Sequence, residues 1–165
     1  MYERIFDTDE LDSIIESYAP DVKLEHFNMI TDHVAIGVIY SSYDSFDVIV
    51  NLAFPTNGAP HLGIVDSDVN GKRVINIGIY DSPDEPMLDI LKDVMPRLLE
   101  LSFDTRILFH CHAGISRSTT LATAYLSKRF GLTLNQTLDF IRSKRHIIQP
   151  NPGFIKALDA FLNQA

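Results

Sequence analysis

The chain has 165 residues, 45% of them hydrophobic, and a formal net charge of −8. This length suits one domain that buries its own core, and a content of only 8 Gly and 8 Pro excludes a collagen-like or low-complexity chain. The lone cysteine, Cys111, excludes an internal disulfide and a cysteine-rich zinc site. We therefore expect a single domain over residues 1–165, in which any special role of Cys111 is chemical.

The first residues carry no export or membrane signal. Residues 1–17 contain six acids, whereas a signal peptide has a basic start followed by an apolar run. No stretch reaches the roughly 18 uninterrupted apolar residues of a membrane-spanning helix. We expect an intracellular protein, cytoplasmic or nuclear, without a membrane partner.

Charge is distributed unevenly along the chain. Residues 1–105 contain 20 acids and 6 bases, whereas residues 106–165 contain 8 bases and 2 acids. The net charge is therefore −14 in the first part and +6 in the second. This asymmetry indicates either an anion-binding region in the last third or a dipolar surface without function.

In chain order, apolar residues at helical spacing predict a short amphipathic helix at 9–18. Runs of β-branched and aromatic residues predict strands at 33–40 and 46–52, the second apolar enough to be covered on both faces. Asn70-Gly71 is a strong turn signal between two further strand-like runs, 63–69 and 73–79. The first half of the chain is therefore rich in strands.

The second half is mostly helical. Apolar spacing predicts helices at 87–101, 135–144 and 153–162, and another that ends near Phe130-Gly131. A short strand at 105–110 precedes that helix. Strands mixed with helices in this order indicate an α/β domain whose sheet carries helices on both faces.

Cys111 directly follows the strand at 105–110 and precedes a helix. In open α/β sheets, ligands bind beyond the carboxyl ends of strands, where the next helix presents unpaired N–H groups. The helix end, nearby amides and the Arg117 cation would stabilise a Cys111 thiolate, which is a nucleophile at neutral pH. The spacing lets the loop from Cys111 to Arg117 close around a tetrahedral anion, with Gly114 supplying the special backbone angles.

The segment His110-Cys-His-Ala-Gly-Ile-Ser-Arg-Ser118 resembles the His-Cys-x5-Arg-Ser/Thr signature of cysteine-dependent protein tyrosine phosphatases, and most closely their dual-specificity branch. Ala124-Tyr-Leu126 and residues 141–158 are similar to the C-terminal half of that branch. The resemblance spans about residues 28–160. It implies a central mixed, mostly parallel sheet flanked by helices on both faces, with departures at His112 and in the loops of residues 57–74.

The resemblance also implies a reaction in two steps without a metal or other cofactor. The Cys111 thiolate attacks phosphorus, and water then hydrolyses the cysteinyl-phosphate. Arg117 would bind two phosphate oxygens through its planar fork. The implied phosphate-binding loop consists of His112, Ala113, Gly114, Ile115, Ser116 and Arg117.

The leaving oxygen needs a proton from a general acid. Asp81, which lies 30 positions before Cys111, is our choice, because the family carries its acid in a loop above the pocket. Asp84, Glu85 and Asp89 are close enough in sequence to compete.

Three further residues have implied supporting roles. Ser118 matches the hydroxyl that helps the cysteinyl-phosphate break down by hydrogen-bonding the sulfur. His110 matches the residue that orients the loop and tunes the thiol. We expect Asn151 to be a turn residue that supports the loop.

Each of these residues also has a plainer interpretation. Cys111 could be a buried apolar filler, Arg117 a helix-surface charge and Asp81 an ordinary turn residue before a proline. Ser118 could only cap its helix. The pair His110 and His112 could bind a metal, but no further ligands cluster nearby in sequence. The bases Arg142, Lys144 and Arg145 are typical of a solvated helix face.

The leading hypothesis is a phosphoprotein phosphatase acting on phosphotyrosine and phosphoserine/threonine. Ile115-Ser116 favours protein substrates, since lipid phosphatases and RNA triphosphatases of the wider superfamily tend to have Lys or Asn there. The alternatives are a phosphoinositide, a phosphoglucan, an RNA 5′ end, or a non-catalytic phosphate-binding module, which would lack Cys111 or Arg117. We expect no nucleic-acid partner, because the chain has no Trp and no clear aromatic cluster. The oligomeric state stays open.

Overall fold

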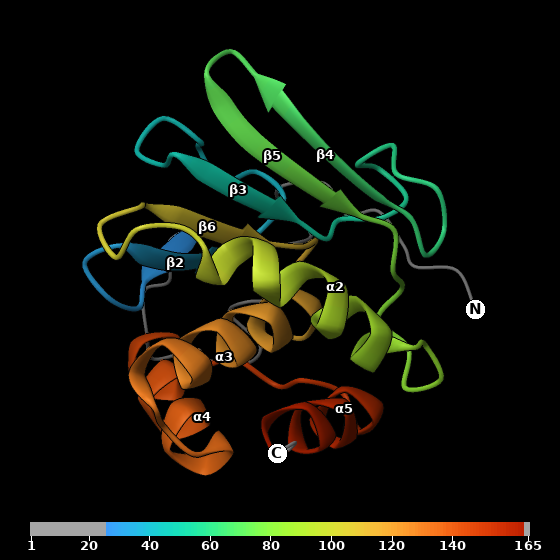
Figure 1. The fold of residues 1–165 in the computed structure, drawn as a ribbon, viewed down its shortest axis with the longest axis vertical. Helices are drawn as coiled ribbons and strands as arrows, with labels where there is room; N and C mark the ends of the chain where they lie inside the picture. The colour runs from blue at the N-terminus through green and yellow to red at the C-terminus, as the bar shows by residue number, and fades with distance from the viewer. Residues whose placement is uncertain (1–25, 164–165) are drawn as a thin grey trace.

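The computed structural model describes residues 26–163, and six strands in it form one sheet (Figure 1). The strands are β1 (Phe27–Met29), β2 (Val34–Gly37), β3 (Val48–Asn51), β4 (Ile64–Val69), β5 (Lys72–Ile77) and β6 (Ile107–His110), in the order β1-β2-β6-β3-β5-β4. The four inner strands run parallel, and the edge strands β1 and β4 are antiparallel to their neighbours. The predicted mixed, mostly parallel sheet is therefore confirmed.

The four helices of the described residues lie on one side of this sheet (Figure 1). They are α2 (Met87–Leu99), α3 (Arg117–Phe130), α4 (Leu134–Lys144) and α5 (Pro152–Leu162). Helix α3 is the central one: it contacts β2 and β6 on one side and the other three helices around it. None of the helices within residues 26–163 is long and apolar enough to cross a membrane.

Alternating side chains of the strands fill two separate apolar clusters. Ile107 and Phe109 of β6 belong to the cluster shared with the helices. Leu108, between them, packs on the opposite face with Phe46 and with the partly buried Tyr43. Within residues 26–163, the segment between β2 and β3 covers that second face and no helix lies on it, so the expected helices on both faces are not found in this part of the chain. The helix predicted at 9–18 lies outside the described residues.

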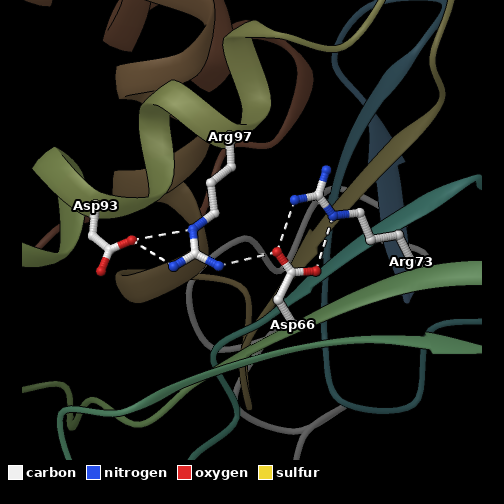
Figure 2. A network of polar contacts seen from close by, with 4 residues as sticks. All are labelled: Asp66, Arg73, Asp93 and Arg97. Atoms are coloured by element: carbon white, nitrogen blue, oxygen red, sulfur yellow. Dashed lines mark hydrogen bonds and ion pairs between the residues drawn. The ribbon is translucent and has the colours of Figure 1, made fainter.

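An ion-pair network fastens the β4–β5 hairpin to α2 (Figure 2). Asp66 of β4 accepts hydrogen bonds of 2.9 and 2.7 Å from Arg73 of β5 and one of 3.1 Å from Arg97 of α2. Arg97 also binds Asp93, one helical turn before it, at 2.7 Å. The bonds from Arg73, followed by the one from Arg97, lower the pKa of Asp66. The network anchors β5, and residues 78–86 follow directly after this strand.

Every strand and helix predicted within residues 26–163 is present, with ends that differ by at most a few residues. Strand β1 is an addition. It has three residues, too few to show an alternating pattern, and it forms because its backbone pairs with residues 35–37 of β2.

Candidate active site

Cys111 lies at the carboxyl end of β6, the strand between β2 and β3. Its side chain is 3% exposed. Residues 111–116, here called the Cys111 loop, connect β6 to the first residue of α3, Arg117. Gly114 has φ +66°, and a Cβ there would lie 2.6 Å from Arg145 Nη2 and 2.7 Å from the Gly37 carbonyl oxygen. The loop therefore requires glycine at this position.

The carbonyl groups of the Cys111 loop are bound by donors from the surrounding structure. The pairs are Cys111 with His110 Nδ1, His112 with the Ile39 amide, Ala113 and Gly114 with the Arg145 guanidinium, Ile115 with the Gln149 amide, and Ser116 with the Thr120 amide and hydroxyl. In a trans peptide the C=O and the following N–H point in opposite directions. The amides of residues 112–117 therefore point away from these donors, as a nest that binds an anion requires.

Cys111 and Ser118 are in direct contact. The Cys111 Sγ lies 3.2 Å from Ser118 Oγ, and both side chains are buried. Ser118 is the second residue of α3, so the turn that starts the helix brings its hydroxyl to the sulfur. This hydroxyl can donate a hydrogen bond to a sulfur that carries negative charge.

Arg117 is a buried cation, with 1% of its surface exposed. Its Nη1 donates to the carbonyls of Phe54 and Ile79, at 3.2 and 2.9 Å. Its Nη2 lies 2.9 Å from His112 Nδ1. Segments after β3 and β5 thus hold the guanidinium at the end of the Cys111 loop, and Arg117 is not a charge on the helix surface.

His110 is neutral and fixed by two contacts. Its Nε2 lies 2.6 Å from the Tyr43 hydroxyl and its Nδ1 lies 3.4 Å from the Cys111 carbonyl oxygen. Burial lowers the pKa of His110 to about 4, and burial also raises the pKa of Tyr43. The hydroxyl therefore donates to Nε2, while the Nδ1–H faces the Cys111 carbonyl.

Asp81 is joined to the Cys111 loop through Asn151. The Asn151 amide nitrogen Nδ2 donates to Asp81 Oδ1 at 2.8 Å, and the Asn151 backbone N–H donates to Ser116 Oγ at 3.0 Å. The Asn151 Oδ1 caps α5 by accepting from the Phe154 amide at 2.9 Å. Asn151 therefore supports both the Cys111 loop and the segment that contains Asp81.

The competing carboxylates have other surroundings. Glu85 accepts from His61 Nε2 at 2.8 Å and from the Tyr80 amide at 3.3 Å. Asp84 is exposed, and Asp89 lies in the first turn of α2. Among the four acids, all of them within the described part of the chain, Asp81 is the one that the observed hydrogen bonds connect to the Cys111 loop.

The interpretation of Arg145 as part of a solvated helix face is wrong. Arg142 and Lys144 are exposed, but Arg145 is fully buried. Helix α4 ends at Lys144, and Arg145 has extended backbone angles that turn its side chain inward. Its guanidinium donates to the Ala113 and Gly114 carbonyls at 3.1 and 3.0 Å and to Asn28 Oδ1 at 2.6 Å. Burial lowers the pKa of Arg145 to about 10.

The sequence and the fold of this chain are similar to those of known proteins. Residues 37–164 match the family model described as "Dual specificity phosphatase, catalytic domain". The 123R protein of Invertebrate iridescent virus 6, whose name describes it as a tyrosine phosphatase, is 32% identical over 135 residues, which cover 81% of this chain and 87% of the viral one. Dual specificity protein phosphatase 1B of Arabidopsis thaliana is 46% identical over 55 residues, 33% of each chain. The crystal structure of human DUSP28 shares the fold, with a TM-score of 0.67, 21% identity, and 84% of this chain and 94% of that one covered.

Proposed function

The chain belongs to the dual-specificity phosphatase family and is a phosphatase, and from this premise we propose that it hydrolyses phosphotyrosine and phosphoserine/threonine in proteins through a cysteinyl-phosphate. The observation that carries the proposal is the contact of 3.2 Å between Cys111 Sγ and Ser118 Oγ. It lies at the base of a loop whose amides point away from its bound carbonyls, beside the buried Arg117.

In the first step, the Cys111 thiolate attacks phosphorus while the bond from phosphorus to the leaving oxygen breaks. Asp81 gives its proton to that oxygen. Arg117 and the loop amides stabilise the charge on the three remaining phosphate oxygens. The products of this step are a cysteinyl-phosphate, a neutral alcohol or phenol, and an Asp81 carboxylate.

In the second step, water attacks phosphorus and gives a proton to the Asp81 carboxylate. The phosphorus–sulfur bond breaks and the electron pair returns to Cys111 as a thiolate. The Ser118 hydroxyl donates to this sulfur and stabilises it as a leaving group. Phosphate then departs, and the enzyme regains a protonated Asp81 and an ionised Cys111.

The charges around the loop support protein substrates over polyanions. Besides β6 and α3, which flank the Cys111 loop, four described segments contact the loop or Arg117: residues 37–43, 53–56, 79–85 and 145–151. Within these segments the one Lys or Arg is Arg145, and it is buried. The segment 79–85 also contains the exposed carboxylates of Asp81 and Asp84. A phosphoinositide or an RNA 5′ end carries several negative charges, and these segments offer no exposed Lys or Arg that would attract them.

Turnover of an aryl phosphate in the presence of a metal chelator tests the proposal. The wild type should release phosphate, and Cys111→Ser should lose this activity. The substrate class is then tested at equal concentration with phosphotyrosine and phosphothreonine peptides, a phosphoinositide, a phosphoglucan and a triphosphorylated RNA. The phosphopeptides should react fastest. A faster reaction with any non-protein substrate would refute the protein-substrate assignment, and an active Cys111→Ser variant would refute the mechanism.

A further inference from the structure

The side chain of His112 is buried and makes two hydrogen bonds beside the phosphate site. It is 1% exposed. Its Nδ1 lies 2.9 Å from Arg117 Nη2, and its Nε2 lies 3.0 Å from the Thr56 hydroxyl oxygen. That hydroxyl also lies 2.5 Å from the Ala53 carbonyl oxygen. Both ring nitrogens therefore have partners, and the partners come from distant parts of the chain.

These contacts form a row of hydrogen bonds that runs from Arg117 through His112 and Thr56 to the Ala53 carbonyl. The direction of each bond in this row follows from Arg117, the first donor. A guanidinium has only donors, so His112 Nδ1 must accept the bond from Arg117. The neutral ring then carries its proton on Nε2, which donates to the Thr56 oxygen. The Thr56 hydroxyl in turn donates to the Ala53 carbonyl. One tautomer of His112 is compatible with all three of these hydrogen bonds, and the row ends on the backbone after β3.

This row complements the direct contacts of Arg117. The guanidinium also donates to the Phe54 and Ile79 carbonyls. Phe54 and Thr56 belong to the same short segment, so residues 53–56 hold Arg117 directly and again through His112. Arginine has a long side chain with several rotatable bonds, and ordering it before the ligand arrives lowers the entropy cost of binding.

We propose that His112, held by Thr56, is a positioning residue that fixes the Arg117 guanidinium in its phosphate-binding orientation. This inference rests on the proposed function, in which Arg117 binds the phosphate of the substrate. It assigns a role to the His112 side chain, whereas the sequence pattern uses only the backbone at this position. His112 acts through Arg117 and takes no part in the transfer of the phosphoryl group.

The first test compares His112→Leu with His112→Asn. Leucine removes the acceptor at similar volume, whereas the asparagine Oδ1 takes the place of Nδ1 and accepts from Arg117. The measurements are the inhibition constant of inorganic phosphate and the kcat and KM for an aryl phosphate. His112→Leu should weaken phosphate binding and raise KM about tenfold, with kcat within about threefold of the wild type. His112→Asn should bind phosphate within about threefold of the wild type.

The second test uses Thr56, which is exposed, so we expect its substitution to leave the fold intact. Thr56→Val removes the hydroxyl with little change of shape, and Thr56→Ser keeps it. Phosphate binding should weaken about threefold in Thr56→Val and stay unchanged in Thr56→Ser. Because Thr56 acts through His112, the double variant Thr56→Val/His112→Leu should bind phosphate as His112→Leu alone does.

These measurements separate the inference from the proposed function. A wild type that neither hydrolyses the aryl phosphate nor binds phosphate overturns both. Two results with an active wild type overturn the positioning role alone. One is equal phosphate binding by His112→Leu and the wild type. The other is a double variant whose loss of phosphate binding is the product of the losses in Thr56→Val and His112→Leu. If His112→Leu does not fold, the Thr56 pair decides, and equal phosphate binding by Thr56→Val and Thr56→Ser overturns the inference.

Discussion

Asn151 donates a hydrogen bond of 2.8 Å from its side-chain nitrogen to Oδ1 of Asp81. The same residue caps the N-terminus of α5, and its backbone N–H binds Ser116 of the Cys111 loop. The proposed acid, Asp81, is therefore tied to the Cys111 loop through one asparagine. Residues 81 and 151 lie 70 positions apart in the chain, and the fold brings them together because α5 packs against the segment after β5.

The role of Asp81 predicts a dependence on the leaving group. Asp81→Asn should lower kcat/KM by about a hundredfold or more for substrates with a poor leaving group, because the departing oxygen then receives no proton. With a phosphorylated phenol of low pKa, the loss should be smaller. The measurement is kcat/KM over a series of aryl phosphates. Asp84→Asn, a change of the neighbouring exposed acid, is the matched control, and an equal loss in that variant would move the acid away from Asp81.

The Asp81–Asn151 hydrogen bond predicts that loss of the Asn151 donor lowers activity in the same leaving-group-dependent way as Asp81→Asn, but by less. Asn151→Ser removes the donor to Asp81 but keeps a side-chain oxygen that can cap α5 and the backbone N–H that binds Ser116. We expect kcat to fall about tenfold for poor leaving groups, with thermal stability close to that of the wild type. The same fall for good and poor leaving groups would show that Asn151 acts on the Cys111 loop and not on the acid.

Burial of His110 predicts a pH-dependent stability. Its pKa is about 4 in the folded protein, below the ordinary value of 6.5. Between these values the unfolded chain binds a proton that the folded protein does not, so the free energy of unfolding falls as pH falls from 6.5 to 4. The loss should reach about 3 kcal/mol. Urea unfolding over this pH range measures it, with His110→Gln as the control, and an identical pH slope in both proteins would contradict the assignment.

The burial of Arg145 predicts that its replacement costs more stability than replacement of the exposed Arg142. Arg145→Ala leaves the Ala113 and Gly114 carbonyls and Asn28 without their buried donor and should cost about 3 kcal/mol of stability. Arg142→Ala, on the exposed face of α4, should cost less than about 0.5 kcal/mol. Urea unfolding at neutral pH compares the two. Equal costs would mean that the bonds from Arg145 to the loop do not stabilise the fold.

Sequence reasoning located the elements within residues 26–163 because their signals are local. The Asn70-Gly71 turn and the apolar spacing of residues 87–99 depend on neighbours in the chain, and both are found in the structure. The position of Cys111 between a strand and a helix follows from the same kind of signal. Strand β1 was missed because its three residues become a strand only by pairing with β2.

The supporting contacts of the site could not be predicted in this way. Arg145 closely follows the exposed bases Arg142 and Lys144 in sequence, and only the backbone after Lys144, which leaves the helix, shows that its side chain points inward. The partner of His112, Thr56, lies 56 positions away. Tyr43, which binds His110, lies in a segment without any sequence signal. Such contacts depend on how distant segments meet around the Cys111 loop.

In the proposed mechanism, Cys111 carries the phosphoryl group between the two steps, and the contact with Ser118 offers a way to trap this intermediate. Ser118→Ala removes the hydroxyl that stabilises the departing sulfur, so hydrolysis of the intermediate should slow about tenfold or more while its formation persists. The most direct measurement is mass spectrometry of this variant after rapid acid quenching during turnover of an aryl phosphate. We expect one phosphoryl group on the peptide that contains Cys111, with a burst of phenol equal to the enzyme concentration. Turnover without any phosphoryl group on Cys111 would contradict this mechanism.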